Sequence, residues 1–167
     1  VSDWATHLLK LRNLQSQTGG ITEFIPLPFV SMESPMYKRG HARPGPTFRE
    51  VLLMHAIARL SLNPLITNIQ TSWVKLGQAG AEACLNAGVN DMGGTLMNES
   101  ISKAAGSIHG QEFTPEKMES FIKNSQRIPR LRDTMYNTIE PKIPNYQPKV
   151  DISQKLQTLL DSAYPTN

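Results

Sequence analysis

Three groups of polar side chains stand where predicted strands end, and they are the residues best placed to do chemistry in this chain. The groups comprise Glu23 in the first strand, Asn68, Gln70, Ser72 and Trp73 in the second, and Thr95, Asn98 and Glu99 around the end of the third. Active sites of parallel α/β proteins lie at the carboxyl ends of the strands. We therefore expect these groups to meet around one ligand.

The second group has the clearest spacing. Asn68, Gln70 and Ser72 share one face of a strand because strand side chains alternate with a period of two. Each polar group left unpaired in a buried strand costs roughly 1–3 kcal/mol. We expect these side chains to face a polar interior that binds a ligand, although hydrogen bonds to neighbouring loops are the alternative.

The other strand residues are individually weaker signals. Glu23 lies among apolar residues, and a buried carboxylate needs a function or a partner such as Arg43. The pair Gly93-Gly94 permits a ligand to approach the backbone closely, or marks a bulge. Trp73 could stack on a ligand ring, or belong to the core.

Loops supply three further candidates. His41 and Arg43 lie in a long connection over residues 29–46, and His109 lies in a later loop. Loops over strand ends commonly carry functional residues. By contrast, His55 and Cys84 fall inside predicted helices, and we expect both to be core residues.

The elements that would position these residues alternate along the chain. Helices are predicted over 3–17, 47–62, 79–86 and 114–125, with a further terminal helix over 150–163. Strands are predicted over 21–27, 66–74 and 89–96. Thr47 and Glu50 form a capping-box pattern, and Thr114-Pro115 is a second helix start. This order indicates an α/β protein with parallel strands.

Composition excludes several classes of protein. The 167 residues carry a net charge of +3 and contain one cysteine, which rules out an internal disulfide. The four histidines lack metal-ligand spacing, so we expect no metal site in this chain. We see neither a run of roughly 20 apolar residues nor a nucleic-acid module. The chain begins at a valine, which suggests a truncated or processed end. We also expect the protein to be cytoplasmic.

Several segments resemble the FO synthase family, in particular its first-acting radical S-adenosylmethionine (SAM) subunit or domain. The matching segments are residues 20–29, 42–47, 68–77, 93–101, 104–110 and 128–132. The resemblance implies the C-terminal half of a partial TIM barrel over residues 1–136, with about three parallel βα units. It leaves residues 137–167 as a proline-rich tail with a helical extension.

The resemblance also implies an activity. Such proteins join a tyrosine-derived 4-hydroxybenzyl group to 5-amino-6-(D-ribitylamino)uracil, using SAM and a 4Fe-4S cluster. The polar groups and loop residues named above would bind SAM or these two substrates. The cluster-binding CxxxCxxC motif is absent, so the chain would need an N-terminal half, and would pair with the second FO synthase subunit or domain.

Three alternatives stay open on the sequence. One is an aminofutalosine-type radical SAM enzyme of menaquinone biosynthesis, which shares the architecture. Another is a non-catalytic ligand-binding module, which the missing cysteines favour. The third is an unrelated phosphate-binding barrel fragment with Gly93-Gly94 as its anion site.

Overall fold

The computed structural model describes residues 2–96, 100–110 and 112–139. These residues fall into two compact units, one extending to Pro129 and one beginning at Arg130. The predicted site residues Asn98 and Glu99 lie outside the described residues, and so does the predicted terminal helix over 150–163.

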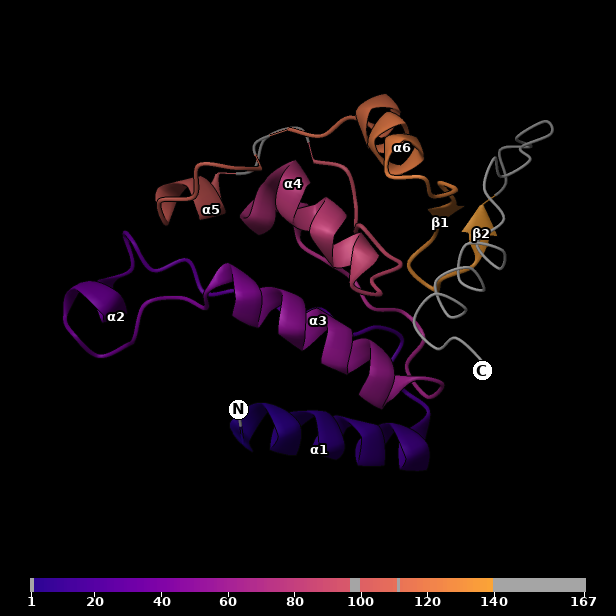
Figure 1. The fold of residues 1–167 in the computed structure, drawn as a ribbon, viewed down its shortest axis with the longest axis horizontal. Coiled ribbons are helices and arrows are strands. Elements are labelled where there is room, and N and C mark those ends of the chain that lie inside the picture. Colours follow the sequence, from indigo (N-terminus) through magenta and orange to yellow (C-terminus); the bar gives the residue numbers. More distant parts are fainter. Residues whose placement is uncertain (1, 97–99, 111, 140–167) are drawn as a thin grey trace, which may run out of the picture. The chain divides into compact units, whose positions relative to one another are not determined.

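Six helices lie in the first unit of the described chain (Figure 1). Their bounds are α1 Ser2–Thr18, α2 Pro35–Lys38, α3 Phe48–Leu62, α4 Trp73–Asn86, α5 Ile101–Ala104 and α6 Pro115–Asn124. Helix α3 packs between α1 and α4. The predicted helices over 3–17, 47–62 and 114–125 are therefore confirmed, each within two residues of its predicted ends.

Helix α3 begins as the capping-box pattern predicts. The Thr47 hydroxyl accepts a hydrogen bond from the Glu50 backbone N–H, and the Glu50 carboxylate accepts one from the Thr47 N–H. These two bonds satisfy amide donors that have no partner within the helix. The Thr114 hydroxyl caps α6 with a single bond, which it accepts from the Lys117 N–H.

Three extended segments run parallel between these helices, but their pairing is much shorter than the predicted strands. Phe24 pairs with Ile69, and Gln70 pairs with Asp91, each as an isolated parallel bridge. The backbone bonds run between Phe24 and residues 68 and 70, and from Thr71 to Asp91. The predicted order of parallel segments is thus present locally, in a part of the chain that is mainly helical.

The predicted end of the second strand was wrong. Trp73 is the first residue of α4, because the Ser72 carbonyl already accepts hydrogen bonds from the N–H groups of Lys75 and Leu76. The same helix was predicted to begin only at residue 79. Gly77 interrupts it with a left-handed φ of 67°, so its first turn is set apart from the rest.

The core lies between the extended segments and helices α3 and α4. Ile69, Ala58 and Cys84 are fully buried there. Trp73 packs edge-on against Phe113, with ring centroids 5.1 Å apart. His55 and Cys84 are both buried, which confirms their prediction as core residues.

The second unit contains a short antiparallel hairpin. Strand β1 Leu131–Arg132 pairs with β2 Thr138–Ile139. The Asp133 carboxylate closes the turn by accepting bonds from the N–H groups of Met135 and Asn137. The predicted domain boundary at residues 136 and 137 stays a prediction.

Candidate functional site

The parallel segments bring two carboxylates and one amide together. With its nitrogen facing the acids, the Gln70 amide donates to Glu23 Oε2 at 3.0 Å and to Asp91 Oδ1 at 3.1 Å. Asp91 Oδ1 also accepts from the Gly93 N–H at 2.7 Å. Each of the three segments contributes one member, and we call Glu23, Gln70 and Asp91 the polar cluster.

Gly93 is required by this arrangement. Its φ is 71°, and a Cβ at this position would lie 2.8 Å from the Gln70 amide. The sequence left open whether Gly93-Gly94 lets a ligand approach the backbone or marks a bulge. The close approach seen at Gly93 is made by the chain's own Gln70 side chain. Gly94 has open space around its Cα.

The second segment alternates as the sequence predicts. Ile69 and Thr71 are buried against the helices, whereas Asn68, Gln70 and Ser72 are half-exposed on the opposite face. Asn68 donates its amide to the Thr22 carbonyl at 2.8 Å. Gln70 is thus the member of this face that joins the polar cluster, while Ser72 stands at the N-terminus of α4.

Trp73 lies in the core rather than on that face. Its side chain is buried, and its indole N–H donates to the Gly94 carbonyl at 3.1 Å. Thr95, which directly follows Gly94 in the chain, is exposed. The structure therefore does not bring Trp73 and Thr95 into the polar cluster.

The three loop candidates are separate from one another. His41 is exposed just after α2. Arg43 forms an ion pair with Glu50 at 3.7 Å, so Glu50 is its partner in place of Glu23. His109 is exposed and packs over Gly77, where an added Cβ would lie 3.0 Å from its Nδ1.

Arg59 aligns the segments that carry Gln70 and Asp91. Its guanidinium donates to the carbonyls of Gly88 and Thr67 and to Asn90 Oδ1, at 2.5–2.7 Å. Asn90 Oδ1 accepts a further bond from the Ile69 N–H at 2.9 Å. These bonds hold the starts of both segments in register, and so place the polar cluster.

Sequence reasoning missed Asp91. It lies on the third predicted strand, two residues before Gly93, whereas the candidates predicted there, Thr95, Asn98 and Glu99, follow the double glycine. The relevant signal is the pairing register, because side chains of neighbouring strands that lie on the same face form pairs. Only the observed bridge between Gln70 and Asp91 identifies that neighbour.

A buried histidine makes this part of the chain sensitive to pH. Burial lowers the pKa of His55 from its ordinary value of 6.5, and contacts with the backbone of Val51 and Gln70 offset this only in part. The folded chain then binds fewer protons than the unfolded chain below pH 6.5. The lowered pKa of His55 therefore contributes fully to the free energy of unfolding above pH 6.5. This contribution is lost as the pH falls toward the pKa of His55 in the folded chain.

We therefore expect the free energy of unfolding to decrease as the pH is lowered from 7.5 to 5. The decrease should be about 1.4 kcal/mol for each unit by which folding lowers the pKa of His55. Urea unfolding of the chain across this range measures the slope. His55→Gln should flatten the slope, whereas His41→Gln, at an exposed position, should keep it. Equal slopes in wild type and His55→Gln would contradict this assignment.

Comparison with known proteins places this site in a family. The family model described as the CofH/MqnC C-terminal region matches residues 18–144. These residues include the parallel segments, the helices α3 to α6 and the whole polar cluster. The chain belongs to this family.

Its curated relatives are FO synthases and related transferases. The chain is 48% identical over 138 residues to the 5-amino-6-(D-ribitylamino)uracil–L-tyrosine 4-hydroxyphenyl transferase of Methanopyrus kandleri, covering 83% of this chain and 37% of the relative. It is 49% identical over 134 residues to the Archaeoglobus fulgidus transferase, covering 80% and 38%. It is 50% identical over 133 residues to the FO synthase of Mycobacterium leprae, covering 80% and 15%.

The chain thus spans a little over a third of the transferases and about a sixth of the FO synthase. Within the described residues, no helix combines the length and apolar character needed to cross a membrane.

Proposed function

We propose that this chain is the substrate-side part of a radical SAM transferase. The full protein would join a tyrosine-derived 4-hydroxybenzyl group to 5-amino-6-(D-ribitylamino)uracil in FO and coenzyme F420 biosynthesis. The observation that carries this proposal is the identity of 48–50% to relatives bearing the transferase and FO synthase names. The same names favour it over an aminofutalosine-type enzyme or a ligand-binding module without catalysis.

We also propose that the parallel segments are the C-terminal half of a partial TIM barrel. Helix α3 connects the first segment to the second, and α4 connects the second to the third. This order of strand, helix and parallel strand is the repeating unit of such barrels.

The missing half of the barrel would add to the edge at Phe24. Both backbone groups of Phe24 bond to the segment over residues 68–70, so those of Glu23 and Ile25 point to the opposite side. A preceding strand from the longer protein would pair there. The second FO synthase subunit or domain is a further partner, and the complete protein would be cytoplasmic.

The described residues do not fit an iron–sulfur cluster. Such clusters are held by several cysteine thiolates. The chain has one cysteine, and burial raises the pKa of the Cys84 thiol, which keeps it protonated at neutral pH. No three His, Cys, Asp or Glu side chains gather as metal ligands in the described ranges. The cluster ligands would lie in the N-terminal half.

SAM, bound at that cluster, would supply the radical that starts the reaction. The contribution of this chain is to bind and orient substrates. Glu23 and Asp91 offer carboxylate oxygens beside the Gln70 amide, a set that suits the hydroxyl groups of a ribityl chain. Asn68 and Ser72 extend the same face. Thr95, His41 and His109 remain proposed substrate contacts, and so do Asn98 and Glu99, which lie outside the described residues.

Product formation tests the function directly. The full-length protein carrying this chain, with a reconstituted cluster, should convert L-tyrosine, 5-amino-6-(D-ribitylamino)uracil and SAM into the coupled product, detected by mass spectrometry. A protein with an intact cluster that cleaves SAM but leaves both substrates unchanged would overturn the proposal.

A further inference from the structure

Lys75 differs from the other lysines of the described chain. Its side chain is half-buried, whereas the other described lysines are exposed. Its ammonium group donates to the hydroxyl of the buried Ser102 at 3.3 Å. No carboxylate of the described residues lies within ion-pair distance of Lys75. An ammonium group has three donors, of which this contact uses one, and the described chain does not neutralise its charge.

Lys75 continues the polar face of the second extended segment. Asn68, Gln70 and Ser72 are half-exposed on this face, and Gln70 belongs to the polar cluster. Lys75 follows Ser72 by three residues, and its backbone N–H donates to the Ser72 carbonyl. Residues at this spacing are neighbours on one side of a helix, so Lys75 lies one turn beyond Ser72. The rise of a strand and of a helix places the Cα atoms of Gln70 and Lys75 at most about 12 Å apart.

Tertiary contacts fix the first turn of α4, and with it Lys75. The Ser107 hydroxyl donates to the Val74 carbonyl at 3.5 Å. Gly110 packs so closely on this turn that a Cβ there would lie 2.3 Å from the Val74 Cα. Ser102, on α5, holds the ammonium group itself. A side chain supported in this way is already positioned for a ligand, as functional residues need to be.

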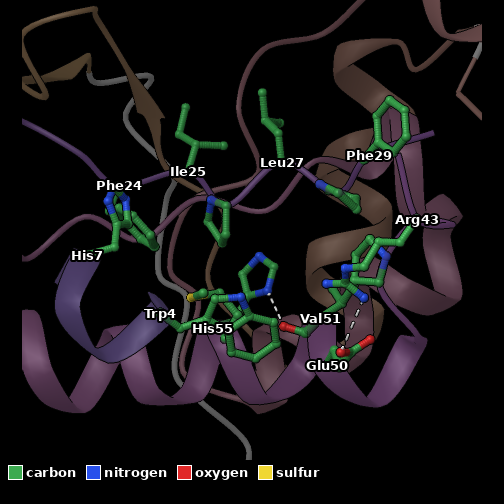
Figure 2. Close-up of a pocket in the computed structure, with 14 residues that line it drawn as sticks. Trp4, His7, Phe24, Ile25, Leu27, Phe29, Arg43, Glu50, Val51 and His55 are labelled. Carbon is green, nitrogen blue, oxygen red and sulfur yellow. Dashed lines mark hydrogen bonds and ion pairs between the residues drawn. The ribbon is translucent and has the colours of Figure 1, made fainter. Parts of the chain in front are cut away.

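Two other cations close to the parallel segments already have partners. Arg43 lines an apolar pocket of about 380 Å³ between α1, α3 and residues 24–29 (Figure 2). There it forms its ion pair with Glu50 at 3.7 Å. The Arg59 guanidinium donates to backbone carbonyls and to an amide oxygen of the segments that it aligns. Of these three cations, Lys75 is the one whose charge is available to a ligand at the polar face.

A half-buried cation without an acidic partner favours a ligand that brings its own negative charge. Hydrogen bonds between an ammonium group and a carboxylate are roughly twice as strong as those between neutral groups. Of the compounds in the proposed reaction, L-tyrosine and SAM each carry an α-carboxylate, whereas 5-amino-6-(D-ribitylamino)uracil carries none. The charge of Lys75 therefore suits the first two compounds and not the third.

We propose that Lys75 binds the carboxylate of an amino-acid ligand, L-tyrosine or SAM, beyond the Ser72 end of the polar face. The proposal rests on the proposed function, which supplies both compounds, and deepens it by assigning a residue of this chain to the group that they share. The polar cluster is left to the hydroxyl groups of the ribityl chain. Two kinds of ligand group are then recognised at different places along one face.

Equilibrium binding of all three compounds to the full-length protein carrying this chain, with its cluster reconstituted, tests the assignment. Lys75→Gln removes the charge and keeps a donor for Ser102. It should raise the Kd of L-tyrosine or of SAM at least about tenfold, as expected for the loss of a hydrogen bond to a charged group. The Kd of 5-amino-6-(D-ribitylamino)uracil should stay unchanged. The ligand whose Kd rises identifies the source of the carboxylate.

Lys103→Gln is the matched control. Lys103 is an exposed lysine directly after Ser102, and its replacement makes the same change of charge without touching the polar face. It should leave all three Kd values unchanged.

Ser102→Ala separates ligand binding from a structural role. It removes the hydroxyl but keeps the ammonium group, so it should raise the affected Kd by no more than about threefold, as expected for one neutral hydrogen bond. If Ser102→Ala weakens binding as much as Lys75→Gln, or if Lys75→Gln weakens all three ligands alike, Lys75 only holds α4 against α5 and the proposal is wrong. Unchanged Kd values for L-tyrosine and SAM in Lys75→Gln, or binding of neither by the wild type, would also overturn it.

Failure of this assignment and failure of the function give different results. If the protein forms the coupled product and Lys75→Gln binds L-tyrosine and SAM as the wild type does, the assignment of Lys75 is wrong and the function stands. If binding of L-tyrosine or SAM depends on Lys75 but no product forms, the function is wrong and the assignment stands.

Discussion

Gln70→Leu in the full-length protein should reduce kcat/KM for product formation by about 100-fold or more, a loss of about 2.7 kcal/mol in transition-state stabilisation. Leucine has nearly the volume of glutamine but has no donor. It would leave Glu23 and Asp91 facing each other without the amide that bonds to both. The two carboxylates would repel and lose the geometry with which they bind substrate hydroxyls.

The KM for each substrate shows where the loss arises. We expect the KM for 5-amino-6-(D-ribitylamino)uracil to rise, with that for L-tyrosine nearly unchanged. Thr67→Ala is the control, because Thr67 is an exposed residue of the same segment and only its backbone carbonyl is bonded to Arg59. A change of less than about threefold in Gln70→Leu would show that the polar cluster does not bind substrate.

Gly110→Ala should give the largest loss of stability, about 3 kcal/mol in the free energy of unfolding. Gly110 has a φ of 78°, and a Cβ there would overlap the backbone of Val74 in the first turn of α4. The left-handed conformation alone costs alanine roughly 1–2 kcal/mol. The remainder comes from moving the loop away from α4, because backbone atoms cannot yield as a flexible side chain can.

Gly40→Ala separates these two contributions. Gly40 has a similar φ of 72° but open space around it, so its replacement should cost only the conformational part. Urea unfolding of the two variants beside the wild-type chain gives the comparison. Equal losses in both would mean that the loop over residues 107–110 accommodates the new methyl group freely.

Local signals in the sequence were sufficient to predict where α3 and α6 begin. Thr47 and Glu50 satisfy each other's backbone donors within four residues, and α3 begins where that pattern predicts. At α6 the Thr114 hydroxyl accepts a bond from the Lys117 N–H, and Pro115 is the first helical residue. Such caps depend on neighbours in the chain, so they can be recognised without knowledge of the tertiary structure.

The extended segments were predicted in the correct order, but the predicted strands were too long. Trp73 has the apolar, aromatic character of a strand residue, yet it begins α4. Its ring is buried against Phe113, a residue forty positions away, and its N–H bonds to the Gly94 carbonyl. Tertiary contacts of this kind outweigh strand propensity, which is itself mainly a measure of packing.

The amino-acid sequence was sufficient to predict the family, the starts of α3 and α6, the alternation of Asn68, Gln70 and Ser72, and the burial of His55 and Cys84. All of these follow from local patterns or from long matching segments. Only the tertiary structure decided that Gln70 joins Glu23 to Asp91, and that His55 and Arg43 line one pocket. Those groupings depend on the register between segments far apart in the chain, which hydrogen bonds such as those of Arg59 set in space.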